Sequence, residues 1–410
     1  MFPEKLLSLA DECERDCAVQ FARIADISRF NTERVMEAFS SNRISERHFT
    51  PTSGYGYNDE GREACEKLYA DIFGTESALV RHSILNGTHA LTIGLFGLLR
   101  TGDTLLSVTG KPYDTLDGVI GISGAPGNGS LIDYGIKYRQ IELTAESRIN
   151  LRAVREALAE DDSIKVVYLQ RSKGYASRRT LTVAEINEVT SLVRSCSNAF
   201  VMVDNCYGAF TEKAEPEADL LVGSLIKNAG GGIAESGAYL VGTEKAVEYA
   251  SYRYSAVGIG GEAGATLGQT KSIIKGLFFA PHVVGEALKT AVFAARLFGR
   301  LGFDVFPSYD EPRSDIIQTL ILGSADALIK FCRGIQSGSP IDSYVAPVPW
   351  AMPGYDDEVI MAAGAFTQGS SIELSADGPL RPPYTAYMQG GLTFESGRYC
   401  ILKAAQLITE

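Results

Sequence analysis

The chain reads FVMVDNCYGAFTEKAEPEADLLVGSLIKNAGGGIAESGAYLVG from residue 200 to residue 242, and this stretch decides its fold. One apolar run ends in an acid at Asp204, a second covers residues 219–223, and Lys227 follows ahead of three glycines. Short apolar runs bounded by turn residues are typical of strands buried in a sheet. The stretch therefore predicts buried strands, with an acid at the carboxyl end of one and a lysine just beyond the next.

Strands and helices alternate on the amino-terminal side of this stretch. Further strands are predicted over residues 78–85, 104–108 and 165–170, with helices over residues 86–99, 114–121, 151–159 and 183–196. Such alternation is typical of an α/β protein with a mostly parallel sheet covered on both faces. Ligands of such sheets bind beyond the carboxyl ends of the strands, where Asp204 and Lys227 are expected.

The length of 410 residues favours two domains and an additional arm. We predict an N-terminal helical arm over residues 1–50, a large domain over residues 51–279 and a smaller C-terminal α+β domain over residues 280–410. The arm has one apolar stripe, so it is expected to pack on its own large domain or on a second subunit. In the smaller domain, a helix from residue 280 to 301 precedes strands that include residues 359–363, 371–375 and 384–388.

Composition excludes several classes of partner. The net charge of -12 argues against nucleic acid and against an anionic membrane, and no apolar run approaches the roughly 20 residues of a membrane span. Seven scattered cysteines without a CxxC pair favour free thiols in a reducing compartment, and the four histidines show no metal-binding spacing. The first residues lack a signal-peptide pattern, so we expect a cytoplasmic protein without a metal.

Asp204 and Lys227 together have the chemistry that a pyridoxal phosphate (PLP) enzyme requires. A lysine amine forms a Schiff base with PLP, and a carboxylate keeps the pyridine nitrogen protonated so that the ring accepts electrons. Leu225 and Ile226 precede the lysine, and glycines follow it. Desolvation in such surroundings is expected to lower the pKa of the amine and to favour the neutral nucleophile.

Candidate phosphate ligands lie where a strand passes into a helix, at Gly87-Thr88-His89. Backbone N–H groups at a helix N-terminus and a hydroxyl form an anion site, to which Ser224 could add a second hydroxyl. The alternative is an ordinary N-cap at Thr88 with a packed or capping His89. Tyr113 could lie flat on the pyridine ring, or it could be an ordinary loop aromatic.

The order of these motifs resembles fold-type I PLP enzymes of the cystathionine/methionine lyase group. It resembles most closely the branch called the methionine gamma-lyase family or aluminium resistance protein. The resemblance rests on Gly87-Thr88-His89-Ala90, Lys111-Pro112-Tyr113-Asp114, Asp204-Asn205-Cys206-Tyr207-Gly208, Ser224-Leu225-Ile226-Lys227-Asn228, residues 170–175 and residues 369–379. It implies a seven-stranded sheet in the large domain and a closed homodimer or homotetramer with active sites shared between subunits.

The resemblance also implies roles for individual residues. Lys227 would bind PLP and then move protons, Asp204 would pair with the pyridinium, and Tyr113 would stack on the ring and help to protonate a leaving thiolate. The phosphate would be held by Gly87, Thr88 and Ser224, with His89 beside them. In the lyase group a tyrosine and an arginine of a neighbouring subunit complete this site. The candidates here are Tyr55, Tyr57 and Arg62, although the tighter Tyr-x-Arg spacing of the group is absent.

The residue that binds the substrate carboxylate is a second difference from the lyase group. The group holds this carboxylate with an arginine on a late strand, because a guanidinium fork matches a carboxylate. The comparable segment here offers Glu373 instead, and Arg381 or Arg178 could substitute. The alternative for Arg381 is a surface turn residue.

The function predicted is a PLP-dependent carbon–sulfur lyase that carries out β- or γ-elimination on a small sulfur-containing amino acid. Transamination or decarboxylation on the same scaffold is an alternative, because a fold does not fix a reaction. A PLP-binding protein with little turnover is another alternative, and the absence of an arginine from the expected strand favours it.

Overall fold

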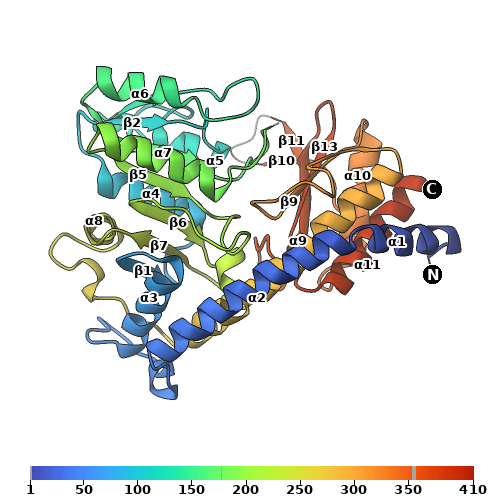
Figure 1. Ribbon diagram of the computed structural model, residues 1–410, viewed down its shortest axis with the longest axis horizontal. Helices are drawn as coiled ribbons and strands as arrows, with labels where there is room; N and C mark the ends of the chain where they lie inside the picture. Colours follow the sequence, from blue (N-terminus) through green and yellow to red (C-terminus); the bar gives the residue numbers. More distant parts are fainter. Residues whose placement is uncertain (1, 177, 353–356) are drawn as a thin grey trace.

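The computed structural model describes residues 2–176, 178–352 and 357–410 of the chain. Two sheets lie in separate halves of the molecule, and helix α9 (Thr270–Arg300) passes from one half to the other (Figure 1). The larger sheet has seven strands in the order β1-β7-β6-β5-β4-β2-β3. These strands are β1 (Ser77–Arg81), β2 (Thr104–Ser107), β3 (Lys137–Gln140), β4 (Ile164–Gln170), β5 (Phe200–Asp204), β6 (Leu220–Ser224) and β7 (Ala238–Gly242).

The predicted α/β class and the mostly parallel seven-stranded sheet are confirmed. Only β7 runs antiparallel to its neighbours β1 and β6 in this sheet, and β3, β2, β4, β5 and β6 are parallel. Asp204 is in register with Gln170 on β4 and with Val222 on β6. The carboxyl ends of β4, β5 and β6 therefore meet at one edge of the sheet.

Helices cover both faces of this sheet, because side chains on its strands alternate between two cores. On β5, Val201 and Val203 pack with one set of helices, whereas Met202 packs with the other set. The first set includes α3 (Glu60–Phe73), α6 (Leu151–Glu160) and α7 (Val183–Cys196). The second includes α4 (Gly87–Leu98), α5 (Asp114–Ile120) and α8 (Glu244–Tyr254).

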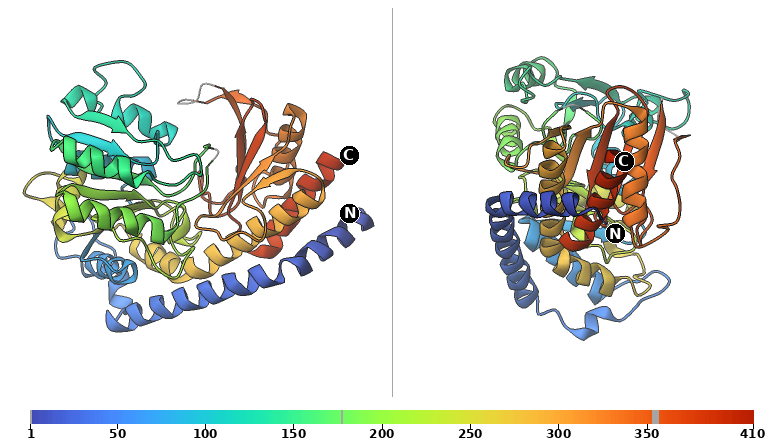
Figure 2. Two further views of the ribbon diagram at one scale, coloured as in Figure 1. Left: turned by 45° about the horizontal axis from the view of Figure 1, so that its top comes forward. Right: turned by 90° about the vertical axis from the view of Figure 1, so that its right-hand side faces the viewer.

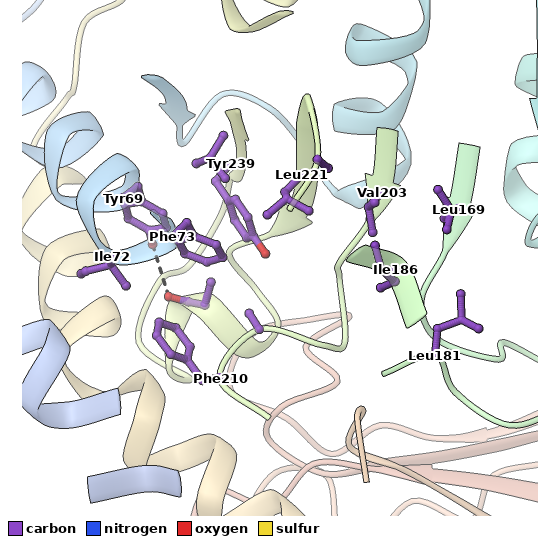
Figure 3. Close-up of a cluster of buried hydrophobic side chains, with 14 of the residues drawn as sticks. Tyr69, Ile72, Phe73, Leu169, Leu181, Ile186, Val203, Phe210, Leu221 and Tyr239 are labelled. Carbon is purple, nitrogen blue, oxygen red and sulfur yellow. Dashed lines mark hydrogen bonds between the residues drawn. The ribbon is translucent and has the colours of Figure 1, made fainter. Parts of the chain in front are cut away.

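An aromatic cluster fixes the loop that follows β6 (Figure 3). Phe73 stacks on Tyr69 and also contacts Phe210 and Tyr239, at centroid distances between 4.9 and 6.0 Å. The Tyr69 hydroxyl donates to the Ala229 carbonyl at 3.2 Å, which is the dashed line in Figure 3. Ala229 lies two residues beyond Lys227, so the core holds the lysine loop directly.

The second half of the molecule is built on a six-stranded antiparallel sheet of order β10-β11-β12-β13-β9-β8. Its strands are β8 (Asp304–Phe306), β9 (Ile317–Ile321), β10 (Trp350–Ala351), β11 (Glu358–Ala362), β12 (Ser375–Pro379) and β13 (Thr385–Gln389). Helices α10 (Ala325–Gly338) and α11 (Phe394–Thr409) pack on it (Figure 2).

The strand predicted over residues 371–375 is wrong, because residues 371–373 form a turn and β12 begins at Ser375. The carboxylate of Glu373 explains the difference. It accepts hydrogen bonds from the backbone N–H groups of Phe366 at 2.7 Å and Thr367 at 2.8 Å, and so closes a loop.

The N-terminal arm consists of α1 (Glu4–Asp16) and α2 (Ala18–Ser41), and α2 lies along α9 of the same chain (Figure 2). Ser28 donates to the Pro281 carbonyl at 2.9 Å, and Asp16 forms an ion pair of 2.6 Å with Arg296. By length and composition α9 could span a membrane, but 78% of its apolar window is buried within the protein, as in a core helix.

Helix α9 begins ten residues earlier than predicted and contains the expected domain boundary at residues 279 and 280. Within this helix Gly276 is a point of close packing. A Cβ atom there would lie 2.2 Å from the carbonyl oxygen of Gly230. The glycine therefore lets α9 pass directly against the lysine loop.

Candidate active site

A cavity of about 410 Å³ lies between the two sheets, beyond the carboxyl ends of β4, β5 and β6. The large domain contributes the start of α4, Tyr113 and the loops after β5 and β6. The small domain contributes Gly369, Asp377, Tyr387 and Gln389. The cavity thus lies where open α/β sheets bind ligands, and β12 and β13 close it from the other side.

Lys227 lines this cavity just after β6. Its Nζ atom lies 3.9 Å from the centre of the Tyr207 ring. Desolvation by burial lowers the pKa of the amine, but the charges of Tyr207, Cys206 and Asp204 and a hydrogen bond to Tyr207 outweigh it and raise the pKa. The prediction of a lowered pKa is therefore wrong, because polar partners surround an amine whose sequence neighbours are apolar.

Asp204 lines the same cavity from the end of β5. Its Oδ1 accepts a hydrogen bond of 3.0 Å from the backbone N–H of Cys206, and its carbonyl accepts one of 3.2 Å from the backbone N–H of Arg171. The first bond orients the carboxylate, and the second fixes the backbone at the end of the strand. Parallel pairing of β5 with β6 thereby brings Asp204 and Lys227 to one cavity.

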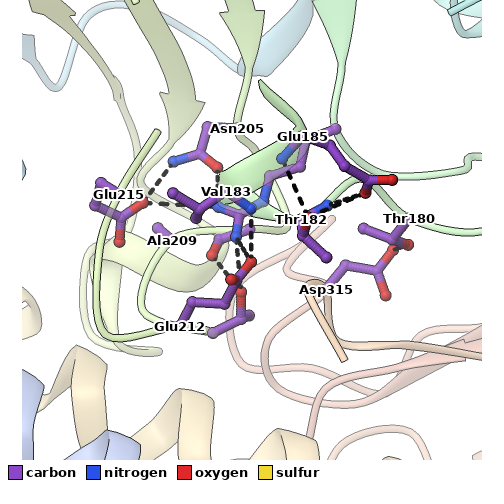
Figure 4. A network of polar contacts seen from close by, with 12 residues as sticks. Thr180, Thr182, Val183, Glu185, Asn205, Ala209, Glu212, Glu215 and Asp315 are labelled. Carbon is purple, nitrogen blue, oxygen red and sulfur yellow. Dashed lines mark hydrogen bonds and ion pairs between the residues drawn. The ribbon is translucent and has the colours of Figure 1, made fainter. Parts of the chain in front are cut away.

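A buried polar network surrounds Asn205, the residue that follows Asp204 (Figure 4). The guanidinium of Arg171, which is 1% exposed, donates to Asn205 Oδ1 and to Glu212 Oε1, each at 2.8 Å. The Asn205 amide in turn donates to Glu215 at 3.0 Å. A buried cation requires such partners, so the network holds the segment that follows Asp204 in one conformation.

A second polar link, also in Figure 4, connects the two halves of the molecule. Ser172 Oγ donates to Asp315 Oδ2 at 3.1 Å, and Thr180 Oγ1 donates to the same oxygen. Asp315 lies just before β9 of the small domain. The link ties the loop after β4 to the sheet that closes the cavity.

The start of α4 and Ser224 form a cradle for an anion. Ser224 Oγ is buried and has no hydrogen-bond partner among the described residues. A Cβ atom on Gly87 would lie 2.7 Å from the sulfur of Cys206, so the backbone here comes close to the strand ends. Backbone N–H groups at the first turn of a helix and an unpaired hydroxyl fit the phosphate of PLP.

Asn86, and not Thr88, is the N-cap of α4. Its side chain accepts from the backbone N–H of His89 at 2.9 Å, and Thr88 shares a hydrogen bond of 2.9 Å with Thr115. Thr88 lines the cavity, but His89 is not among the residues that line it. The His89 Nδ1 atom accepts from the backbone N–H of Leu85 at 3.1 Å, so this histidine closes the loop before the helix.

Tyr113 lines the cavity, and its backbone N–H donates to Gln170 Oε1 at 2.6 Å. Its ring meets the Tyr175 ring edge to face, with centroids 6.1 Å apart. The structure therefore places Tyr113 with Lys227 and Asp204.

The three residues expected to reach a neighbouring subunit separate into two groups. Tyr55 and Tyr57 are exposed and stack on each other with centroids 5.6 Å apart. Arg62 is buried, and its guanidinium donates to the carbonyls of Gly56, Glu262 and Gly264. Arg62 therefore joins two loops of its own chain.

The three residues expected to bind the substrate do not line the cavity. Glu373 closes a loop through its two backbone hydrogen bonds. Arg178 is buried, and it donates to the carbonyls of Gln170 at 2.8 Å and Ser172 at 2.6 Å. Arg381 is exposed, pairs with Asp357 at 2.8 Å, and lies with Arg178 at an adjoining cavity that shares Tyr113 and Tyr175.

Several site residues were not predicted. Tyr207 was quoted within a motif without a role, and Gln170 ends β4 just as Asp204 ends β5, which was a usable signal. Asp377 lay within the motif at residues 369–379 and Tyr387 within a predicted strand, but neither was given a role, and the pairing of β12 with β13 places them in register.

The fold is that of fold-type I PLP-dependent proteins, and the site has the groups that such proteins use to hold the cofactor. Residues 6–409 match the family described as methionine gamma-lyase. The chain therefore belongs to the methionine gamma-lyase family, which confirms the resemblance noted in the motifs.

Three relatives are similar over nearly their whole length. The uncharacterized protein YnbB of Bacillus subtilis (strain 168) is 48% identical over 99% of this chain and 97% of its own. A candidate cystathionine beta-lyase involved in aluminum resistance, from Clostridium acetobutylicum, has a TM-score of 0.97 and 47% identity, covering 100% of this chain and 96% of its own. A carbon-sulfur lyase involved in aluminum resistance, from Clostridium novyi NT, has a TM-score of 0.95 and 50% identity, covering 99% of this chain and 96% of its own.

Replacing Tyr207 with phenylalanine is expected to lower the pKa of the Lys227 amine. The change keeps the ring beside Nζ but removes the hydroxyl that stabilises the ammonium form. NMR titration of the ¹³C-methylated lysines, without added PLP, measures this pKa, and the Lys227→Ala variant assigns the signal. An unchanged or higher pKa would show that the hydroxyl does not stabilise the charged amine.

Proposed function

We propose that this protein is a PLP-dependent carbon–sulfur lyase that eliminates a thiol from a small sulfur-containing amino acid. The family and the similarity to a carbon-sulfur lyase support this class of reaction. The main support for the proposal is one observation: Lys227, Asp204 and the anion cradle of Gly87 and Ser224 line one cavity. This is the set of groups that would bind a phosphorylated pyridine aldehyde.

PLP, when bound, would supply an electron sink for the carbanion at the substrate α-carbon. Lys227 would take the proton from that carbon, and the Asp204 carboxylate would keep a proton on the ring nitrogen. Tyr113 would give a proton to the departing sulfur. Gly87, Thr88 and Ser224 would hold the phosphate and so fix the ring relative to Lys227.

Replacing Lys227 with alanine is expected to remove the visible absorption band of the lysine-linked cofactor and to lower turnover by about 10²–10⁴-fold. The assay mixes the loaded protein with cysteine, cystathionine, methionine and alanine, and measures thiol, keto acid and ammonia. Lys275→Ala is the matched control, because it removes an exposed lysine from α9.

The products separate the proposed lyase from its alternatives. Equal amounts of thiol, keto acid and ammonia support elimination. Keto acid without ammonia would indicate transamination, carbon dioxide would indicate decarboxylation, and an absorption change without product would indicate a binding protein. Full activity in Lys227→Ala would contradict the role of this lysine.

We also propose that the chain works in the cytoplasm as a homodimer or homotetramer. Exposed apolar side chains support the assembly, since a cluster of them marks an interaction surface. Tyr55, Val257 and Leu267 are 76%, 83% and 63% exposed, and the backbone N–H of Gly264 joins their two loops by donating to the Tyr55 carbonyl. Leu85, 69% exposed, lines the cavity, so the expected interface would adjoin the active site.

Sedimentation velocity at micromolar concentration is expected to show a dimer or tetramer for the parent chain. The double variant Tyr55→Asp, Leu267→Asp is expected to sediment as a smaller species, because two buried charges would oppose association. Tyr344→Asp, at a residue that is 86% exposed, is the control and is expected to leave the assembly unchanged. A monomeric parent would contradict the proposal.

A further inference from the structure

An acid from the small domain faces the site from the side opposite the phosphate cradle. Asp377 on β12 lies in register with Tyr387 on β13, and both line the cavity. Asp377 lies close enough to Lys227 for the charge of the lysine to act on it. The cavity thus has a second carboxylate besides Asp204, and the proposed reaction assigns it no role.

Asp377 has fewer partners than a buried carboxylate usually has. Its Oδ1 atom is buried and has no hydrogen-bond partner among the described residues. Burial raises the pKa of Asp377 to about 7, against the opposing effects of a hydrogen bond from Tyr175 and the charge of Lys227. A buried carboxylate without a cation is unfavourable, so a cation placed beside it would be stabilised.

Aromatic rings line the cavity next to this carboxylate. The Tyr175 ring contacts Tyr113, with centroids 6.1 Å apart, and Tyr387, with centroids 4.8 Å apart. The Tyr387 hydroxyl donates to the Tyr175 carbonyl at 2.9 Å and so fixes this tyrosine wall. Aromatic faces combined with a carboxylate form a typical site for an organic cation.

The described lining residues include no arginine, and Lys227 is their only basic side chain. Lys227 is assigned to the cofactor and to proton transfer. Beyond the sulfur, a substrate group that carries a negative charge would meet Asp377 without compensation, and a neutral group there would leave Oδ1 unpaired. A positively charged group would pair with the Asp377 carboxylate and would also be attracted to the faces of the tyrosine rings.

We propose that the cavity selects a thioether amino acid that carries a second positive charge beyond the sulfur, and that Asp377 and the tyrosine wall of Tyr113, Tyr175 and Tyr387 bind this charge. The α-amino group would react at Lys227, and the distal ammonium would lie beside Asp377. This inference rests on the proposed carbon–sulfur lyase function and specifies its substrate class. Asp377 is then a specificity-determining residue.

Three S-substituted cysteines of similar size test the charge preference. They are S-(2-aminoethyl)-cysteine, S-ethylcysteine and S-(2-carboxyethyl)-cysteine, with a positive, a neutral and a negative side chain. In each elimination the α-proton is removed, the carbon–sulfur bond breaks and its electron pair leaves on sulfur. One water then yields pyruvate and ammonium, so thiol, pyruvate and ammonium form in equal amounts.

The loaded parent enzyme is expected to cleave the aminoethyl compound with kcat/KM at least about tenfold above that for the ethyl compound, and the carboxyethyl compound most slowly. Asp377→Asn is expected to reduce the preference to about twofold. Asp326→Asn makes the same chemical change at an exposed site on α10 and is expected to keep the parent preference.

Binding to Lys227→Ala loaded with PLP, measured by calorimetry, gives a second readout that needs no turnover. The same charge order is expected there, with its loss when Asp377→Asn is added. A parent enzyme that treats the three compounds alike would overturn the inference, and this result does not depend on the folding of any variant. An equal loss for all three compounds in Asp377→Asn would also overturn it, because Asp377 would then act on Lys227.

The failure of this inference and that of the proposed function are distinguishable. Thiol release without charge preference leaves the lyase proposal standing and rejects the role of Asp377. Charge-selective binding without thiol release from any substrate supports Asp377 and contradicts the lyase.

Discussion

The side-chain amide of Asn228 joins the two loops on which the site depends. It donates to the carbonyls of Tyr207 and Ala209, each at 3.0 Å, and so ties the lysine loop to the loop after β5. Without this bond, parallel pairing would fix only the strand ends and not the side chains beyond them. Lys227 lies against Tyr207 because the loops that carry them are bonded to each other.

Close packing against α9 also holds the lysine loop in place. Gly231 and Gly276 bring the lysine loop and α9 so close that a Cβ atom on either residue would meet the backbone of the other segment. Because α9 also packs against the small-domain sheet, one helix positions both sides of the cavity. The buried Arg171 network fixes the other loop, so the site is rigid where the chemistry requires fixed distances.

The sequence predicted the residues of the site that directly follow a recognisable apolar strand. Asp204 and Lys227 follow adjacent parallel strands, so their meeting could be inferred from apolar runs alone. The partners that raise the pKa of Lys227 could not be inferred, since the strongest of them, Tyr207, contacts the amine only through loop geometry. The surroundings of Arg62 could not be inferred either, because carbonyls about 200 residues later in the chain enclose it. The start of β12 could not be inferred either: the predicted strand began too early, because the Glu373 carboxylate closes a loop and the strand begins only at Ser375.

Lys227 is proposed to bind the cofactor covalently. Reduction of the PLP-loaded protein with sodium borohydride, followed by peptide mass mapping, tests this role most directly. One pyridoxyl group per chain is expected, on the peptide that contains Lys227. A label on another lysine, such as Lys173 at the adjoining cavity, or no label at all, would contradict it.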